Sequence, residues 1–179
     1  MSMTDGKGSG GWVRPLGWSL AAGSVLLPLV AMQFTAEVEW TFGDFLFAAL
    51  VIGTVGIALE VAVRVSGNWL YRAGAAAGLG TAFLLTWANA AVGYIGDDNP
   101  YNIVFFGVVL LAFAGALLAR LRAPGMAAAM LAAGIAHAVA GGIGYRSDPI
   151  TGPITIVFVG MWLTSAALFA KAAREEGQL

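Results

Sequence analysis

Cysteine is absent from this chain of 179 residues, and histidine occurs once, as His137. Without cysteine the chain forms no disulfide and offers no thiolate nucleophile, iron–sulfur ligand or cysteine ligand for zinc. A single histidine neither completes a three-histidine zinc site nor clamps a haem between two imidazoles of one chain. We therefore expect no metal site and no cofactor. An enzyme is disfavoured because the sequence provides no cluster of acid, base or metal ligands.

Charge is also scarce, since charged residues make up 11% of the chain and the formal net charge is −1. Ordinary soluble domains contain about 25% charged residues. No run of basic residues offers a surface for nucleic acid, so no nucleic-acid partner is expected. Hydrophobic residues make up 59% of the chain, and 25 residues are glycine. This composition excludes an ordinary soluble domain and predicts closely packed membrane helices surrounded by lipid.

Six apolar stretches are long enough to cross a hydrocarbon core of about 30 Å, which takes roughly 17 to 25 helical residues. The sequence therefore predicts an all-α integral membrane protein with six transmembrane helices and short connections. We expect a disordered Gly- and Ser-rich tail over residues 1–11, a membrane domain over 12–174 and a second tail over 175–179. The six predicted spans are Trp18–Phe34, Phe42–Val65, Tyr71–Ile95, Ile103–Leu121, Met126–Gly144 and Ile154–Ala172.

Positive charge is distributed unequally between the predicted connections. If the N-terminus is cytoplasmic, eight Lys and Arg residues lie on the inner side and only Arg146 lies on the outer side. An excess of Lys and Arg is typical of cytoplasmic loops, so we expect both termini in the cytoplasm. The inner residues are Lys7, Arg14, Arg64, Arg72, Arg120, Arg122, Lys171 and Arg174.

Two polar segments mark predicted helix starts on the outer side. Asn99 followed by Pro100 is typical of a helix N-terminus, and the preceding Asp97 and Asp98 favour the positive end of the helix dipole. The segment Thr41–Asp44 resembles a capping box for the second span. Capping is the preferred interpretation of both segments. The alternative for Asp97 and Asp98 is a cation-binding site on the outer face.

Two pairs of segments resemble one another beyond their hydrophobicity. Ala88–Gly96 matches Ala136–Gly144 at five of nine positions, and Pro100–Gly107 matches Pro153–Gly160 at five of eight. These matches indicate a duplicated helical hairpin, with spans three and four repeated as spans five and six. Both hairpins would begin on the cytoplasmic side, so the repeat is parallel, unlike the inverted repeats of many transporters.

Glu60 and Arg64 are the charged pair closest to the membrane interior. They lie four residues apart, on the same face of the second predicted helix near its cytoplasmic end. One interpretation is an ion pair whose long side chains reach the interface. The other makes Glu60 a protonatable group of an inner cavity, paired with Arg72 or Arg120. A Glu60→Gln exchange separates the two, because only the second requires the carboxylate for activity.

A layer of polar and aromatic residues lies deeper in the predicted membrane. Counted from the outer ends of their helices, Asn89, His137 and Trp162 lie at similar depth, and Thr164 is close by. Three interpretations remain open. The side chains form hydrogen bonds between helices, they line a pocket for an ion or small solute, or His137 is the single axial ligand of a pigment or haem.

Small residues recur at four-residue spacing and predict close helix packing. Gly74 and Gly78 form a GxxxG motif, and Gly134, Ala138 and Gly142 continue the same spacing on the fifth span. Such motifs serve contacts within one chain or between protomers, and the sequence does not choose between them.

Three segments carry a resemblance to a known group of proteins. Phe34–Phe45, Glu60–Arg64 and Trp87–Asn102, with its Asp-Asn-Pro motif, resemble a family of small bacterial multi-span membrane proteins with no known activity. The resemblance covers Gln33–Ala140 and does not include a counterpart of His137. It implies a bacterial inner-membrane location and no particular chemistry.

Two functions from different classes follow from these features. The first is a channel or facilitator for an ion or small solute, which passes either through one protomer or through a homo-oligomer. In this hypothesis the layer of Asn89, His137 and Trp162 lies above Glu60. The alternative is a non-catalytic accessory or scaffolding subunit of a larger membrane complex. The short loops, the scarcity of catalytic polar residues and the abundance of small residues motivate this alternative, which ranks second to the channel or facilitator.

Overall fold

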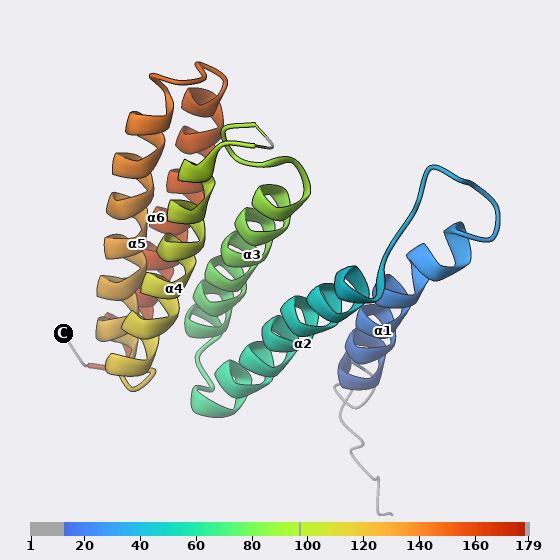
Figure 1. Cartoon of the computed structure of the whole chain (residues 1–179). Helices are drawn as coiled ribbons and strands as arrows, with labels where there is room; N and C mark the ends of the chain where they lie inside the picture. The colour runs from blue at the N-terminus through green and yellow to red at the C-terminus, as the bar shows by residue number, and fades with distance from the viewer. Residues whose placement is uncertain (1–12, 97, 178–179) are drawn as a thin grey trace, which may run out of the picture. The chain divides into compact units, whose positions relative to one another are not determined.

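The computed structural model describes residues 13–96 and 98–177 (Figure 1). Three sequence-based predictions therefore fall wholly or partly outside the described residues. These are the tail over residues 1–11, the candidate cation ligand Asp97, and the end of the C-terminal tail at residues 178–179.

The described residues form six α-helices and one short 3-10 turn, with no β-strand among them (Figure 1). All six helical segments are long and apolar enough to cross a membrane, which confirms the prediction of an all-helical chain with six candidate spans. The elements are α1 (Val13–Ala31), α2 (Phe42–Val65), α3 (Trp69–Val92), η1 (Pro100–Asn102), α4 (Ile103–Leu118), α5 (Ala123–Gly144) and α6 (Thr151–Glu175).

The ends of several helices differ from the predicted spans. The first helix begins at Val13 and ends at Ala31, earlier than predicted at both ends. The sixth is longer than predicted and extends from Thr151 to Glu175. In both cases a proline in the first turn is compatible with helical backbone, because the first N–H groups have no partner within the helix. Hydropathy alone missed the first turn of α1 and the first and last turns of α6, which contain polar residues.

Local hydrogen bonds fix two helix starts as predicted. Thr41 N donates to Asp44 Oδ2 at 2.7 Å, and Asp44 N donates to Thr41 Oγ1 at 3.4 Å, which is the reciprocal pattern of a capping box. Asn99 Oδ1 accepts from Tyr101 N at 3.0 Å, with Pro100 at the first position of η1. The capping interpretation is therefore confirmed for Thr41–Asp44. Asn99 caps the 3-10 turn η1, and the N-cap of α4 itself, Asn102, makes no side-chain cap hydrogen bond.

The chain divides into two compact units between Ile57 and Ala58, within α2. In unit 1, the Trp18 ring of α1 packs on α2 at Gly56. A Cβ added to Gly56 would lie 3.0 Å from this ring. No residue in the apolar window of α1 is buried.

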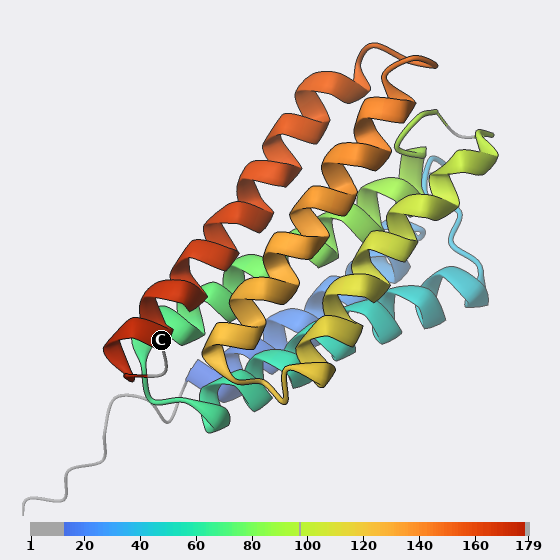
Figure 2. The same cartoon turned by 90° about the vertical axis from the view of Figure 1, so that its left-hand side faces the viewer.

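Unit 2 contains a ring of four helices that positions the candidate site (Figure 2). Around the ring, α3 contacts α6, α6 contacts α5, α5 contacts α4, and α4 contacts α3. Large apolar side chains cover its outside, and Leu118 and Ile156 are 85% and 74% exposed. The buried interior instead contains His137, Thr81 and Ser165. An apolar exterior around a partly polar interior is the arrangement expected for a helix bundle in lipid.

Glycines allow close approach between helices of unit 2. A Cβ at Gly74 would lie 3.2 Å from the Phe169 ring, and one at Gly78 would lie 2.9 Å from Ser165 Oγ. Ser165 Oγ in turn donates to the Gly74 carbonyl oxygen at 2.7 Å. The predicted GxxxG motif therefore packs α3 against α6 within one chain.

The predicted small-residue ridge on α5 packs within the chain only in its first half. Gly134 is buried against Trp162, but Ala138 and Gly142 are exposed. An α-helix has 3.6 residues per turn, so residues spaced strictly four apart shift around the helix by about 40° at each step. A ridge of this spacing therefore leaves the buried face after one or two steps. The buried face of α5 instead runs through Gly134, His137, Gly141 and Gly144.

Candidate functional site

The connection from α3 to α4 begins with a glycine-framed turn that points two side chains into unit 2. Gly93 and Gly96 have positive φ angles of 67° and 81°, which glycine adopts without a steric penalty. A Cβ at Gly93 would overlap the Gly96 carbonyl oxygen, so this position requires glycine for space as well as for conformation. Between them, Tyr94 and Ile95 are 5% and 6% exposed.

Two asparagines hold this turn in place through their side chains. Asn89 Oδ1 accepts from Tyr94 N at 3.1 Å, and Asn89 Nδ2 donates to the Asn102 carbonyl oxygen at 3.0 Å. Asn102 Oδ1 accepts from Ile95 N at 2.9 Å, and Asn102 Nδ2 donates to Gly96 O at 2.7 Å. The primary role of Asn89 is therefore to position the backbone of Tyr94.

The hydroxyl of Tyr94 joins α5 and α6 in a buried polar cluster. Tyr94 Oη lies 2.9 Å from His137 Nε2 and 3.2 Å from Thr155 Oγ1. His137 is 0% exposed and Thr155 is 8% exposed. A Cβ at Gly141 would overlap the Thr155 side chain, so this glycine allows α6 to approach α5 at the cluster. We call this group the Tyr94–His137–Thr155 cluster.

Aromatic rings enclose the cluster. Tyr94 stacks on Phe105 with ring centroids 3.8 Å apart and an interplanar angle of 25°. His137 stacks on Phe158 with centroids 5.5 Å apart and an interplanar angle of 17°. A pigment or haem ligated by His137 would need the space that these rings occupy. The geometry therefore gives no support to the axial-ligand hypothesis.

The cluster is built for hydrogen bonding between neutral groups. Burial raises the pKa of the Tyr94 hydroxyl above its ordinary value, and the hydrogen bond with Thr155 opposes this rise. Tyr94 therefore keeps its proton at neutral pH and remains a hydrogen-bond donor. Among the described residues, no group of three or more His, Asp or Glu side chains is arranged to hold a metal ion.

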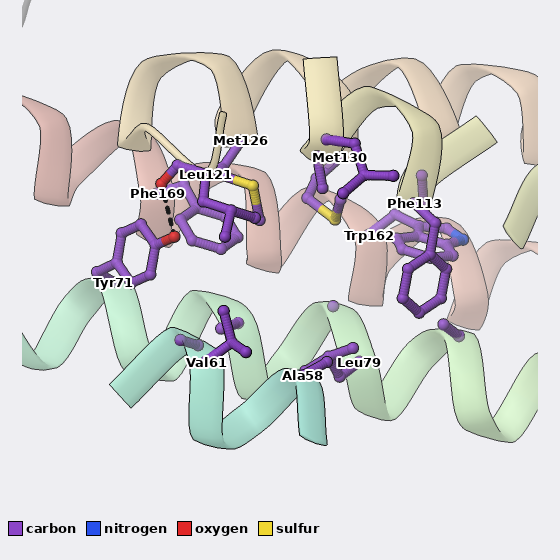
Figure 3. A pocket seen from close by; sticks show the side chains of 17 residues that line it. Ala58, Val61, Tyr71, Leu79, Phe113, Leu121, Met126, Met130, Trp162 and Phe169 are labelled. Carbon is purple, nitrogen blue, oxygen red and sulfur yellow. Dashed lines mark hydrogen bonds between the residues drawn. The ribbon is translucent and has the colours of Figure 1, made fainter. Parts of the chain in front are cut away.

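A partly open cavity of about 230 Å³ lies within unit 2 (Figure 3). Its lining comes from α3 to α6, from the last turns of α2 and from the α4–α5 connection. Among these lining residues, only Tyr71 and Trp162 have a side-chain polar hydrogen to donate, and none is charged. Tyr71 Oη donates to the Leu121 carbonyl oxygen at 2.7 Å, the dashed line in Figure 3. The cavity is therefore almost wholly apolar.

Glu60 and Arg64 form the predicted ion pair, with Arg64 Nη2 2.7 Å from Glu60 Oε2. The Arg64 side chain is 65% exposed, and neither residue lines the cavity. Arg72 instead donates to the carbonyl oxygens of Val63 and Ser66 at the end of α2. The geometry favours the interfacial ion pair over a protonatable site in a cavity.

The other predicted site residues separate into different places. His137 joins the polar cluster, Trp162 lines the cavity, and Asn89 supports the turn beside the cluster. Thr164 is exposed and donates to the Gly160 carbonyl oxygen on its own helix, so it belongs to neither site. Asp98 is also exposed.

Tyr94 and Thr155 are the site residues that sequence reasoning missed. Tyrosine is enriched at membrane interfaces, but this preference does not predict contacts within the bundle, where Tyr94 is buried in the core. The signal was its place between two glycines, because Gly93 and Gly96 allow the chain to turn back into the bundle.

The fold and the site together define an all-helical protein of the multi-pass membrane class, with six candidate spans and an enclosed polar cluster beside an apolar cavity. Comparison with known proteins found no matching family model, no matching curated protein and no matching solved structure.

Proposed function

We propose that this chain binds a small, mainly apolar solute inside unit 2 and acts as a facilitator for it in the membrane. The observation that carries this proposal is the cavity of about 230 Å³ with no charged lining residue. An apolar cavity of about 150 Å³ is large enough to hold benzene, so this one has room for a ring or a short chain. An ion is a poor occupant, because an apolar lining does not replace its hydration shell.

We also propose a bacterial inner-membrane location with both termini in the cytoplasm. The distribution of Lys and Arg supports this orientation, because Arg64 and Arg72 flank the α2–α3 connection and Arg120 and Arg122 flank the α4–α5 connection. Positive residues on these connections are typical of a cytoplasmic side.

Equivalent contacts support the proposed parallel duplication of α3–α4 as α5–α6. In the alignment of the two hairpins, Gly93 pairs with Gly141 and Asn102 pairs with Thr155. A Cβ added at Gly93 would contact the Asn102 side chain, and a Cβ added at Gly141 would contact the Thr155 side chain.

A second candidate function is an accessory subunit of a larger membrane complex. It is favoured by α1, whose apolar window contains no buried residue. Gentle extraction separates the two functions. An accessory subunit migrates with other chains, whereas the proposed facilitator migrates alone or as a homo-oligomer.

Filling the cavity tests the proposed function. Bromobenzene is a small apolar probe that quenches tryptophan, and Trp162 is 1% exposed, so lipid-phase collisions reach it poorly. We expect saturable quenching of the Trp162 emission, obtained as the difference between wild type and Trp162→Phe. Ala112→Leu places extra carbon atoms in the cavity and should weaken this saturable binding at least about 10-fold, which corresponds to about 1.4 kcal/mol.

The matched control changes the same residue type on the opposite side of the same helix. Ala114 is exposed on α4, so Ala114→Leu should leave the saturable quenching unchanged. Equal saturable binding in wild type and Ala112→Leu contradicts the proposal, as does quenching that rises linearly with no saturation in wild type.

A further inference from the structure

The cavity of unit 2 runs lengthwise along one stripe of α3. The α3 residues that line it are Tyr71, Ala75, Gly78, Leu79 and Ala82, which lie on one face of the helix because they recur at three- and four-residue spacing. From the first to the last of them the helix rises about 16 Å, at roughly 1.5 Å per residue. In Figure 3 Tyr71 lies at one end of the lining, and Phe113 and Trp162 lie at the other. We call this elongated cavity the α3 slot.

Small side chains form three walls of the α3 slot. Each wall has two of them on successive turns, namely Ala58 and Ala62 of α2, Ala75 and Gly78 of α3, and Ala112 and Ala116 of α4. The space that they leave therefore continues along each helix past a single turn.

The α3 slot occupies only one half of the helices that line it. Tyr71 lies in the first turn of α3, and Ala82 lies near the middle of that helix. On α5 the lining residues, Met126 and Met130, lie in the first turns. A hydrocarbon core of about 30 Å gives each leaflet a depth of about 15 Å, close to the length of the slot. The slot therefore has the depth of one leaflet, on the side of the α2–α3 connection.

The dimensions of the α3 slot correspond to a single hydrocarbon chain. An extended alkyl chain advances about 1.3 Å per carbon, given C–C bonds of about 1.5 Å, so about 12 carbons cover the length of the slot. A cavity of about 150 Å³ holds benzene, a ring of six carbons, and by the same ratio 230 Å³ holds about nine carbons. Length and volume together indicate one linear chain of about 9 to 12 carbons.

We propose that the solute of unit 2 is a lipid that inserts one linear alkyl chain into the α3 slot, with its tail at the Trp162 ring and its polar head outside at the Tyr71 end. The inference rests on the proposed function and names its substrate class. The Tyr71 end is the polar one, since Tyr71 Oη donates to the Leu121 carbonyl oxygen there, and the exposed Arg120 and Arg122 flank Leu121 in the sequence. No charged side chain lines the slot, so a charged head stays outside it.

Two isomers of a brominated decanol test this assignment. The bromine of 10-bromodecan-1-ol is at the tail and that of 2-bromodecan-1-ol is beside the head, while chain and hydroxyl are the same. Each is added to the full chain in lipid nanodiscs, and the Trp162 emission is obtained as the difference between wild type and Trp162→Phe. We expect saturable quenching by the tail isomer and several-fold weaker quenching by the head isomer, whose bromine lies about 10 Å further from the ring.

A block at the Tyr71 end distinguishes a chain from a small ring. Ala75 lies one turn from Tyr71 and is 5% exposed, so Ala75→Leu should abolish the quenching by the tail isomer. Bromobenzene, which needs only the Trp162 end, should still quench saturably and shows that the variant is folded. The neighbouring Ala76 is exposed, and Ala76→Leu should retain both effects.

The outcomes separate this inference from the proposed function. Equal quenching by the two isomers in wild type, or tail-isomer quenching that persists in Ala75→Leu, overturns the inserted chain. If bromobenzene still quenches saturably, the proposed function is intact. If neither bromobenzene nor the decanols quench saturably in wild type, both fail.

Discussion

Gly93→Ala is expected to destabilise the protein by about 3 kcal/mol or more, the largest effect of any single methyl group that we identify. Two costs combine at this position. A non-glycine residue with a φ of 67° and a ψ of 141° is strained by about 1 to 3 kcal/mol. Its Cβ would also overlap the Gly96 carbonyl oxygen, and overpacking typically adds about 1 to 3 kcal/mol. Unfolding in mixed detergent micelles, followed by circular dichroism, measures the loss.

Substitutions at two other glycines separate the cost of backbone strain from the cost of overpacking. Gly96 has a φ of 81°, but no described atom lies within 4 Å of the position that a Cβ would occupy, so Gly96→Ala should show the cost of strain alone. Gly107 lies within α4 with no such atom near its Cβ position, so Gly107→Ala should be neutral or stabilising by up to about 1 kcal/mol. If Gly93→Ala unfolds like Gly107→Ala, the turn described for Gly93–Gly96 is incorrect.

Tyr94→Phe is expected to lower the free energy of unfolding by about 1 to 2 kcal/mol. The substitution keeps the ring that stacks on Phe105 but removes the hydroxyl that contacts His137 and Thr155. His137 Nε2 is then buried without its partner, which costs more than the modest average hydrogen bond between membrane helices. The same unfolding assay measures the effect.

A double variant distinguishes lost pairing from lost packing. If Tyr94 and His137 stabilise the fold through their hydrogen bond, Tyr94→Phe combined with His137→Leu should destabilise less than the sum of the single changes. Tyr145, which is 53% exposed, supplies the control, and Tyr145→Phe should change the stability by less than about 0.5 kcal/mol. Strict additivity of the two changes, or an equal loss in Tyr145→Phe, contradicts the role of the Tyr94–His137–Thr155 cluster.

Features that depend on neighbouring residues in the sequence could be predicted. The six helices follow from the lengths of apolar segments, and the Glu60–Arg64 ion pair follows from four-residue spacing on one helix. The capping roles of Thr41 and Asn99 likewise need only the residues beside them. These predictions succeeded because each interaction is complete within a few residues.

Features that arise between helices could not be predicted in the same way. The cavity is the space left when α3 to α6 and the end of α2 pack, and no local pattern determines its volume. Tyr94 reaches His137 across 43 positions of sequence, through a turn whose direction depends on the backbone of Gly93 and Gly96. The predicted layer of Asn89, His137 and Trp162 divides between the polar cluster and the apolar cavity.

Binding of a small solute in the cavity of unit 2, beside Trp162, is the central claim for this protein. The most direct measurement is a density map of the full chain, purified from membranes into lipid nanodiscs, at a resolution that shows single side chains. We predict density in the cavity that no protein atom explains, in contact with the ring of Trp162. A cavity filled by its own lining side chains, with Phe113 or Met130 moved into it, would contradict the claim.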